Sequence, residues 1–375
     1  MNDLIETVLL PLSDGDKEEY RKAFGTLVPG ELPVVLFDDI KHELEYREQL
    51  IYRPSFHSGQ RKLFLSELQF LTDAPRDATV IYAGAAPWSH GAYLAKLLPH
   101  MKFLLVDPRE FSIHGIESIE VRTIDGFKRA RTKVCYLRGL FTRELAEEIR
   151  TKLKNIYFIS DIRTVQSGGS PTTLDIIWNL SQQFNWLTIM KPLRSMFKFR
   201  HPFYNEPDSH FLTECGRSPF KEDFEFSLSH GIDFVENFKT RTLVYPSGEI
   251  RLQAWAPTAS TETRLVIDKK YKLKDYGNHL EYQNRFYFHN TVSRPFGLYK
   301  NPNKIARMSF CECHDCALEN EIWTRFGSND VRKNVRELGA ATRSLGWHGI
   351  PDLRRAKNEA TKYNFSLGIG SKSRT

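Results

Sequence analysis

The stretch "VIYAGAAPWSHGAYL", residues 80–94, decides the fold. It begins with an apolar run typical of a buried strand, continues through the small residues 84–87, and ends with helical character. A turn with almost no side chains lets a ligand approach the backbone closely. The stretch therefore predicts a strand, a ligand-binding turn and a helix, although Trp88 stands where a nucleotide-binding loop more often has glycine.

Strand-like and helix-like segments alternate along most of the chain. The predicted strands are 79–83, 102–107, 134–137, 155–161, 185–190 and 263–268, and the predicted helices include 37–50, 59–71, 142–153 and 172–184. Near-continuous apolar strands between amphipathic helices are typical of a sheet that is covered on both faces. We therefore predict an α/β fold with a doubly wound, mostly parallel, Rossmann-like sheet.

The sequence also suggests how the chain is divided. We expect an N-terminal extension over 1–35, one large domain over 36–300 with an insertion at about 204–250 over the sheet edge, a helical part over 301–365 packed on the same domain, and a disordered tail over 366–375.

Composition points to an intracellular protein with a polyanionic partner. The net charge is +7 and the pI is about 9.0, which favours nucleic acid modestly. Five cysteines in 375 residues do not form a disulfide framework, so we expect a reducing compartment, the cytoplasm rather than the nucleus. The N-terminus lacks a basic segment typical of a signal peptide, and no apolar run is long enough to cross a membrane.

An acidic residue follows the second predicted strand. In doubly wound sheets the ligand binds at the carboxyl ends of the strands, and an acid there can accept the hydroxyls of a ribose. Asp107 has this position, but the glycine pattern that binds a pyrophosphate is absent. These features favour an adenosine cofactor without phosphate, S-adenosylmethionine, over the simpler alternative of a tight turn beside an exposed acid.

Four further stretches each place a charged residue beside a predicted element. They are "GQRKLFLSEL" with Lys62, "FISDIR" with Asp161, "KFRHPF" with Lys198 and "APTASTETRL" with Glu262. Taken singly, each residue is explained as a surface charge or a helix cap.

Together, in this order and with 80–94, these stretches resemble a specific family. They are similar to the poxvirus-type cap-specific mRNA (nucleoside-2′-O-)methyltransferases, which also serve as poly(A) polymerase regulatory subunits and have relatives in other large DNA viruses and in trypanosomes. The resemblance covers residues 37–290. It implies an enzyme that uses S-adenosylmethionine to methylate the ribose 2′-hydroxyl near the 5′ end of capped mRNA. The alternative is an RNA-binding processivity subunit of a poly(A) polymerase, with secondary or lost catalysis.

The resemblance also implies roles for individual residues. Lys198 would be the general base in a tetrad with Lys62, Asp161 and Glu262, and Lys62 would be the second cation that lowers the pKa of that base. The implied cofactor-binding residues are Gln60, Tyr82, Gly84, Ala86, Pro87, His90, Asp107, Arg109, Leu140 and Phe141. The indole of Trp88 would either close over the methionine end of the cofactor or point outward. No metal is implied.

The expected cap pocket departs from the family pattern. Tyr46 and Phe203 match the two aromatic residues that stack on a methylated guanine. Asn205 and Gln283 stand where the family has two acids, and Ala259 stands where it has an aromatic residue. We therefore expect cap dependence that is either weaker than in the family or built differently, with Glu206, Asp208 or Glu281 in place of the two acids. RNA would follow Arg53, Arg61, Arg163, Arg194 and Arg200.

A cysteine-rich stretch lies beyond these motifs. Cys311, Cys313, His314 and Cys316 form one short cluster, whereas structural zinc sites usually pair two clusters. We favour buried thiols over a zinc site.

Overall fold

The computed structural model describes residues 30–31, 36–46, 59–164, 171–204, 208–257, 259–290, 294, 299–300 and 315. The chain forms two compact units. The first consists of Met1–Gln69, Leu252–Thr261 and Gln283–Thr375, and the second of Phe70–Arg251 and Glu262–Tyr282. The predicted segments 1–35, 301–365 and 366–375 fall almost wholly outside the described residues and stay predictions.

The second unit is built on an eight-stranded sheet with the order β4-β5-β3-β2-β6-β7-β10-β9. Its strands are β2 (Thr79–Ala83), β3 (Lys102–Asp107), β4 (Ser118–Glu120), β5 (Val134–Arg138), β6 (Ile156–Ser160), β7 (Arg194–Phe199), β9 (Glu249–Arg251) and β10 (Thr263–Asp268). The first six of these in chain order pair in parallel, whereas β10 pairs antiparallel with β7 and β9. The predicted mostly parallel α/β fold is confirmed.

β2 occupies the point at which the strand order reverses. From β2 the chain continues to β3, β4 and β5, which lie on one side of β2, and later to β6 and β7, which lie on the other. In such sheets a ligand binds outside the carboxyl ends of the strands at this switch point. The turn that follows β2, within the stretch 80–94, is therefore placed where a ligand is expected.

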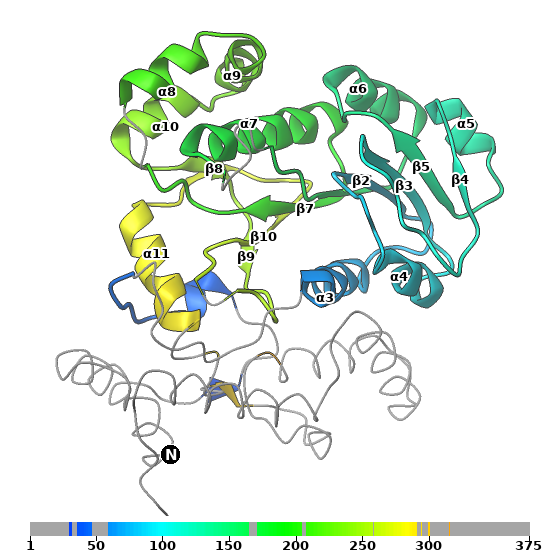
Figure 1. Cartoon of the computed structure of the whole chain (residues 1–375), viewed down its shortest axis with the longest axis horizontal. Coiled ribbons are helices and arrows are strands. Elements are labelled where there is room, and N and C mark those ends of the chain that lie inside the picture. Colours follow the sequence, from blue (N-terminus) through cyan, green and yellow to red (C-terminus); the bar gives the residue numbers. More distant parts are fainter. Residues whose placement is uncertain are drawn as a thin grey trace, which may run out of the picture. The chain divides into compact units, whose positions relative to one another are not determined.

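Helices cover both faces of this sheet (Figure 1). α6 (Arg143–Lys152) and α7 (Thr173–Met190) pack side by side on one face, next to α5 (Ile124–Arg129). α4 (Gly91–Leu97) lies on the other face. α5, α6 and α7 each begin after a threonine whose hydroxyl accepts a backbone N–H of the first turn, which explains where these helices start.

The strand predicted over 185–190 is wrong. These residues form the end of α7, and the strand beside β6 is instead β7. α7 is buried on nearly all sides, so it lacks the polar stripe by which an amphipathic helix is recognised. A buried helix and a buried strand then have the same apolar appearance in sequence.

The helix predicted over 37–50 is also largely wrong. The described part is a short 3-10 helix at Phe37–Asp39 followed by irregular chain to residue 46, and 47–50 lie outside the described residues. The Arg285 side chain donates hydrogen bonds to the carbonyl oxygens of Phe37 and Ile40, at 2.8 and 2.9 Å. The backbone groups are thus satisfied by a tertiary contact in place of a helix.

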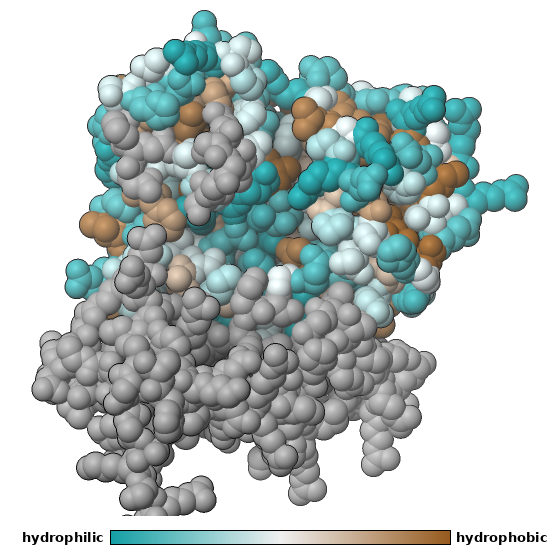
Figure 2. Space-filling view, in the orientation of Figure 1, coloured by the Kyte–Doolittle hydropathy of each residue, from teal (hydrophilic) through white to brown (hydrophobic). Residues whose placement is uncertain are grey.

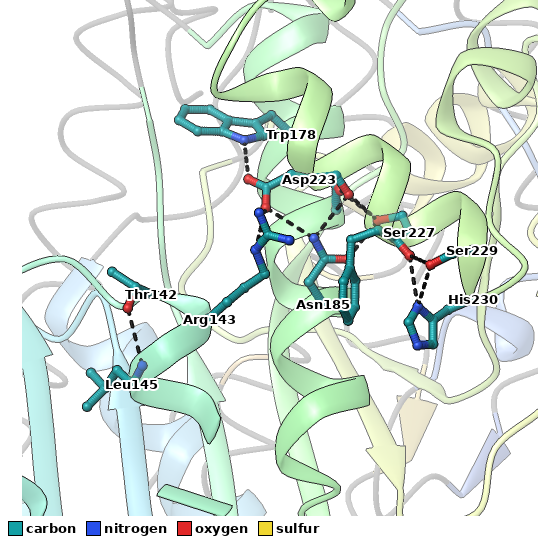
Figure 3. A network of polar contacts seen from close by, with 11 residues as sticks. Thr142, Arg143, Leu145, Trp178, Asn185, Asp223, Ser227, Ser229 and His230 are labelled. Atoms are coloured by element: carbon teal, nitrogen blue, oxygen red, sulfur yellow. Dashed lines mark hydrogen bonds and ion pairs between the residues drawn. The ribbon is translucent and has the colours of Figure 1, made fainter. Parts of the chain in front are cut away.

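The region 204–250 forms helices α8 (Asp208–Cys215), α9 (Phe220–Ser229) and α10 (Phe234–Thr240), and then β8 (Val244–Pro246), which pairs with β11 (Leu273–Asp275), and β9. α9 packs on α7 through a buried polar network (Figure 3). The Asp223 carboxylate accepts from Trp178 Nε1 at 2.8 Å and from Asn185 Nδ2 at 3.2 Å. Arg143 of α6 lies 3.7 Å away. The three groups compensate for the burial that raises the pKa of Asp223.

The first unit contains most of α3 (Gly59–Leu71), most of α11 (His279–Phe288) and the parallel pair β1 (Gly30–Glu31) and β12 (Tyr299–Lys300). The guanidinium of Arg61 lies 4.1 Å over the ring of Trp255, and Gln253 donates to Ser66 at 2.9 Å. These contacts join 252–257 to α3. Across the described parts of the chain, no helix is long and apolar enough to span a bilayer.

His201 predicts a specific loss of stability in acid. It is buried, its Nε2 donates to the carbonyl of Gly277, and burial lowers its pKa from 6.5 to about 4. As the pH falls below about 6.5, His201 therefore binds a proton in the unfolded chain. In the folded chain it does not bind this proton until the pH reaches about 4. Between pH 7.5 and 4.5, we expect this residue to remove about 2 to 3 kcal/mol from the free energy of unfolding.

Urea unfolding of wild type and His201→Gln at these two pH values measures the effect. The glutamine amide can still donate to Gly277 but does not titrate. The free energy of unfolding of the variant should therefore fall by about 2 to 3 kcal/mol less than that of wild type between these two pH values. Equal pH dependence in the two proteins would contradict the assignment.

Candidate functional site

An ion pair between Lys198 and Asp161 forms the centre of the candidate site. Asp161 directly follows β6, and Lys198 lies near the end of β7, which is parallel to β6. The two residues therefore meet at the carboxyl edge of the sheet, with Lys198 Nζ 3.1 Å from Asp161 Oδ1. Both side chains are mostly buried, at 14% and 17% exposed. The structure thus brings these two predicted tetrad residues into direct contact.

Arg264 is a third member of this ion cluster, and the sequence did not predict it. It is only 2% exposed, and its Nη1 lies 2.7 Å from the same oxygen of Asp161. Arg264 stands opposite Lys198 in the antiparallel register of β10 and β7. One carboxylate therefore joins two cations. An arginine inside a strand ordinarily suggests the solvent face, so its only sequence signal was its position two residues after Glu262.

The other two predicted tetrad residues are Glu262 in the second unit and Lys62 in the first. Glu262 precedes β10 and forms an ion pair with Arg163, which lies two residues after Asp161. Desolvation lowers the pKa of Arg163. Three predicted tetrad residues are thus in one neighbourhood of the second unit. Lys62 is buried in α3 of the first unit.

The loop after β2 is held tightly by its neighbours. Gly84 has φ +76°, and its N–H donates to the carbonyl of Val106 at 2.9 Å. A Cβ on Gly84 would lie 2.8 Å from the backbone nitrogen of Ile162, the residue after Asp161. Only glycine fits here, both in conformation and in space. The predicted cofactor loop and the predicted catalytic acid are therefore in direct backbone contact.

Trp88 has neither of the two positions expected for it. Its side chain is fully buried, 5.5 Å between ring centroids from Phe103 of β3. The indole lies directly against Gly91, where a Cβ would overlap the ring. Trp88 also has φ +55°, a conformation that favours glycine. The indole is thus part of the core beside the start of α4, and its packing helps to fix the conformation of the loop after β2.

Asp107 is a second buried carboxylate beside this loop, at 2% exposed. It accepts from the backbone N–H groups of Ala86 and Arg109, at 3.0 and 2.9 Å. The guanidinium of Arg109 adds two hydrogen bonds, from Nε at 3.1 Å and from Nη2 at 3.0 Å, although its side chain is 68% exposed. The predicted ribose-binding acid thus has its own basic partner.

The other predicted cofactor residues differ in the solvent exposure of their side chains. Tyr82, Ala86 and His90 are buried, and Pro87 is exposed. After β5, Leu140 is 72% exposed, whereas Phe141 is buried and packs edge-on against Trp186 at 4.8 Å. Of the two residues expected against an adenine, Leu140 is the accessible one. Gln60 belongs to α3 of the first unit.

The predicted cap residues are found in both units. In the first unit, Tyr46 donates from its hydroxyl to the carbonyl of Ala259 at 3.3 Å, and Gln283 is buried. In the second unit, the Arg200 guanidinium lies 4.1 Å over the ring of Phe203. Asn205 lies outside the described residues. An arginine on the ring face of Phe203 is a cationic neighbour that the sequence did not predict.

A small, open pocket adjoins Lys198. It is lined by Ile162, Arg163, Ile176, Asn179, Leu180, Gln183, Lys198 and Arg200. Hydrophilic residues also gather over the middle of the face displayed in Figure 2, between α8–α10 and the β3–β5 end of the sheet.

The arginines expected to follow RNA are dispersed. Arg163 and Arg200 line the pocket beside Lys198. Arg194 lies at the opposite end of β7, paired with Asp268 at 2.9 Å. Arg61 belongs to the first unit, and Arg53 lies outside the described residues. Within the described part of the second unit, Arg163 and Arg200 are therefore the two that lie beside the ion pair.

Metal-binding side chains do not cluster in the described ranges: no group of three or more His, Cys, Asp or Glu residues there could hold an ion. The stretch containing Cys311, Cys313, His314 and Cys316 lies outside them. Cys135 and Cys215 are buried thiols that form no disulfide.

Comparison with known proteins identifies the family. The family model described as poly A polymerase regulatory subunit matches residues 30–313. The chain belongs to this family. The predicted resemblance is thus confirmed, and all of the predicted catalytic, cofactor and cap residues lie within the matched range.

Curated relatives carry a more specific name. The chain is 27% identical over 246 residues to the "Cap-specific mRNA (nucleoside-2′-O-)-methyltransferase" of Myxoma virus (strain Lausanne), covering 62% of this chain and 60% of that protein. It is 28% identical over 211 residues to the protein of the same name from Fowlpox virus (strain NVSL), covering 52% and 65%. The chain thus spans about 60% of the length of the curated relatives it matches.

Proposed function

We propose that this member of the poly A polymerase regulatory subunit family methylates the ribose 2′-hydroxyl near the 5′ end of capped mRNA, with S-adenosylmethionine as methyl donor. The observation that carries the proposal is the buried Lys198–Asp161 pair at the carboxyl edge of the sheet, in backbone contact with the loop after β2. The names of the viral relatives support the same reaction.

The residues around the loop fit an adenosine cofactor without phosphate. The loop lies at the switch point of the sheet, Asp107 follows the adjacent strand, and Leu140 offers an exposed apolar side chain beyond β5. When bound, S-adenosylmethionine would supply an electrophilic methyl group. We assign its ribose to Asp107 and its methionine end to the backbone of 84–90.

Lys198 would hold and remove the proton of the 2′-hydroxyl. In-line methyl transfer needs an aligned hydroxyl and a group that accepts its proton. Asp161 would orient the amine through the observed ion pair, and Arg264 would offset the charge of Asp161. Asp161 is thereby shared between two cations, so it stabilises the protonated form of Lys198 less than an undivided carboxylate would.

Transfer of a labelled methyl group to capped RNA, followed by nuclease mapping of the product, tests the proposed reaction. Label on the 2′-oxygen of a cap-proximal nucleotide is expected. Absence of transfer together with tight binding to uncapped oligonucleotides would favour the alternative, an RNA-binding subunit of a poly(A) polymerase.

Cap recognition gives a separate prediction. Gln283 carries no charge, and Arg200 already lies on a face of Phe203. A cationic methylguanine therefore gains little electrostatic stabilisation at this ring. We expect RNA that begins with 7-methylguanosine to bind at most about threefold more tightly than the unmethylated form. A threefold difference in affinity corresponds to no more than about one exposed cation–π contact. Filter-binding titrations with both RNAs measure this ratio, and a ratio of a hundred would contradict the prediction.

A further inference from the structure

Arg294 is the centre of a buried polar cluster in the first unit, and the proposed reaction does not use it. Its guanidinium binds the carboxylate of Asp315 with two hydrogen bonds, from Nε to Oδ1 at 2.8 Å and from Nη2 to Oδ2 at 3.0 Å. Both side chains are almost completely buried, at 1% and 3% exposed. A charge at this depth has to be paired and hydrogen-bonded, and the planar fork of an arginine then has one orientation.

The same guanidinium reaches a loop that is distant in sequence, residues 256–260. Nη2 donates to the carbonyl of Ala256 at 2.6 Å, where this loop begins. Nη1 donates to the side-chain oxygen of Asn290 at 3.2 Å, and Asn290 Nδ2 donates to the carbonyl of Ser260 at 2.8 Å, where the loop ends. Arg294 thus holds both ends of the loop 256–260, one directly and the other through Asn290.

This loop contains one predicted cap residue and contacts another. Ala259 belongs to the loop, and its carbonyl accepts the hydrogen bond from the hydroxyl of Tyr46. The ring of Tyr46 also packs edge-on against Tyr287, with 5.8 Å between centroids. All of these residues lie in the first unit. The position of the loop 256–260 therefore determines one of the contacts that hold Tyr46.

We propose that Arg294 and Asp315 are positioning residues for cap binding, because they fix the loop 256–260 and, through Ala259, the side chain of Tyr46. The inference rests on the proposed function, since it assigns Tyr46 to the cap. It gives a role in recognition to a part of the chain that follows the resemblance over 37–290. Asp315, in the cysteine-rich stretch, also lies beyond the residues 30–313 that the family model matches.

Two variants separate positioning from an effect on stability alone. Arg294→Met leaves the buried carboxylate of Asp315 without its cation, so this variant should unfold at a lower urea concentration and bind the dinucleotide m7GpppG weakly. Arg294→Met combined with Asp315→Leu removes both charges, and apolar residues of similar size can replace a buried ion pair without loss of stability. The double variant should unfold near the wild-type urea concentration. It should still bind m7GpppG about tenfold more weakly, since a hydrogen bond from a charged group, such as that to Ala256, is worth about this factor.

Fluorescence titration of m7GpppG, calorimetric titration of S-adenosylhomocysteine and urea unfolding give the three readouts. The affinity of the double variant for S-adenosylhomocysteine should stay within about twofold of wild type, because Asp107 and the loop 84–90 belong to the second unit. Arg217→Met combined with Glu214→Leu is the matched control, since it replaces a surface ion pair of the second unit by the same two residues. This control should bind both ligands as wild type does.

A milder pair of variants keeps the test independent of the folding of the double variant. Tyr46→Phe keeps the ring but removes its hydrogen bond to Ala259, and Asn290→Ala removes the link between Arg294 and Ser260. Each should weaken m7GpppG binding about threefold, the effect of one ordinary hydrogen bond. Because both changes act through one loop, their combination should weaken binding by less than the product of the two single effects.

Three results would overturn the inference. Recovery of both stability and m7GpppG affinity in the double variant would show that the ion pair serves only the fold. Wild-type affinity in Tyr46→Phe and Asn290→Ala would show that the loop does not hold Tyr46 for the cap, whether or not the double variant folds. Absence of m7GpppG binding to wild type would reject the proposed cap recognition together with this inference, and the titration of S-adenosylhomocysteine would then show separately whether the cofactor site stands.

Discussion

Lys198→Met is expected to reduce methyl transfer at least a hundredfold while cofactor affinity stays within about threefold of wild type, because proton removal by a positioned base typically contributes this much or more. Methionine has nearly the length of lysine but accepts no proton. Asp161 keeps a cationic partner in this variant, because Arg264 Nη1 lies 2.7 Å from its carboxylate. Loss of turnover would therefore report on chemistry and not on folding.

Lys198→Arg separates the role of a base from that of a charge. Arginine keeps the positive charge beside Asp161 but does not give up its proton. If Lys198 serves only to orient the hydroxyl by its charge, the arginine variant should retain much of the wild-type turnover. If it is the base, both variants should be inactive.

Single-turnover transfer from labelled cofactor to capped RNA and calorimetric titration of S-adenosylhomocysteine give the two readouts. Lys270→Met is the matched control, since Lys270 is exposed and follows β10 in the same unit. Wild-type turnover in Lys198→Met would overturn the assignment of the base.

Much of the sheet could be predicted from sequence, because its strands are continuous apolar runs between helices with polar faces. One exception is the strand expected over 185–190. The end of α7 is apolar on nearly every side because α6, α9 and the sheet all pack around it, and such a helix cannot be distinguished from a strand by periodicity. The partners that bury α9 against α7, among them Asp223, lie far apart in sequence.

The candidate site could be predicted only in part, for a similar reason. Asp161 and Lys198 follow parallel neighbouring strands, so the topology alone brings them to one edge. Arg264 reaches the same carboxylate because β10 runs antiparallel to β7, and strand direction cannot be read from an apolar run. The second cation expected from the resemblance is Lys62, which belongs to the first unit, and within the second unit Arg264 is a further cation on Asp161.

The packing of Trp88 gives the largest expected effect on stability. Gly91→Ala would place a methyl group within the indole ring, which also packs against Phe103. We expect the free energy of unfolding to fall by about 3 kcal/mol, the upper part of the usual range for overpacking. Displacement of the indole should also disturb the loop after β2 and weaken cofactor binding.

A double-mutant cycle measured by urea unfolding distinguishes this clash from an ordinary effect of alanine in a helix. Trp88→Ala alone should cost about 4 kcal/mol by leaving a cavity. In that background Gly91→Ala meets no ring and should cost less than about 1 kcal/mol, so the two changes should be strongly non-additive. Gly126→Ala in α5 is the control, since its Cβ would lie no closer than 3.4 Å to a neighbouring atom. If the losses in the free energy of unfolding at positions 88 and 91 are additive, the indole can move aside without cost. Trp88 packing would then not fix the conformation of the loop after β2.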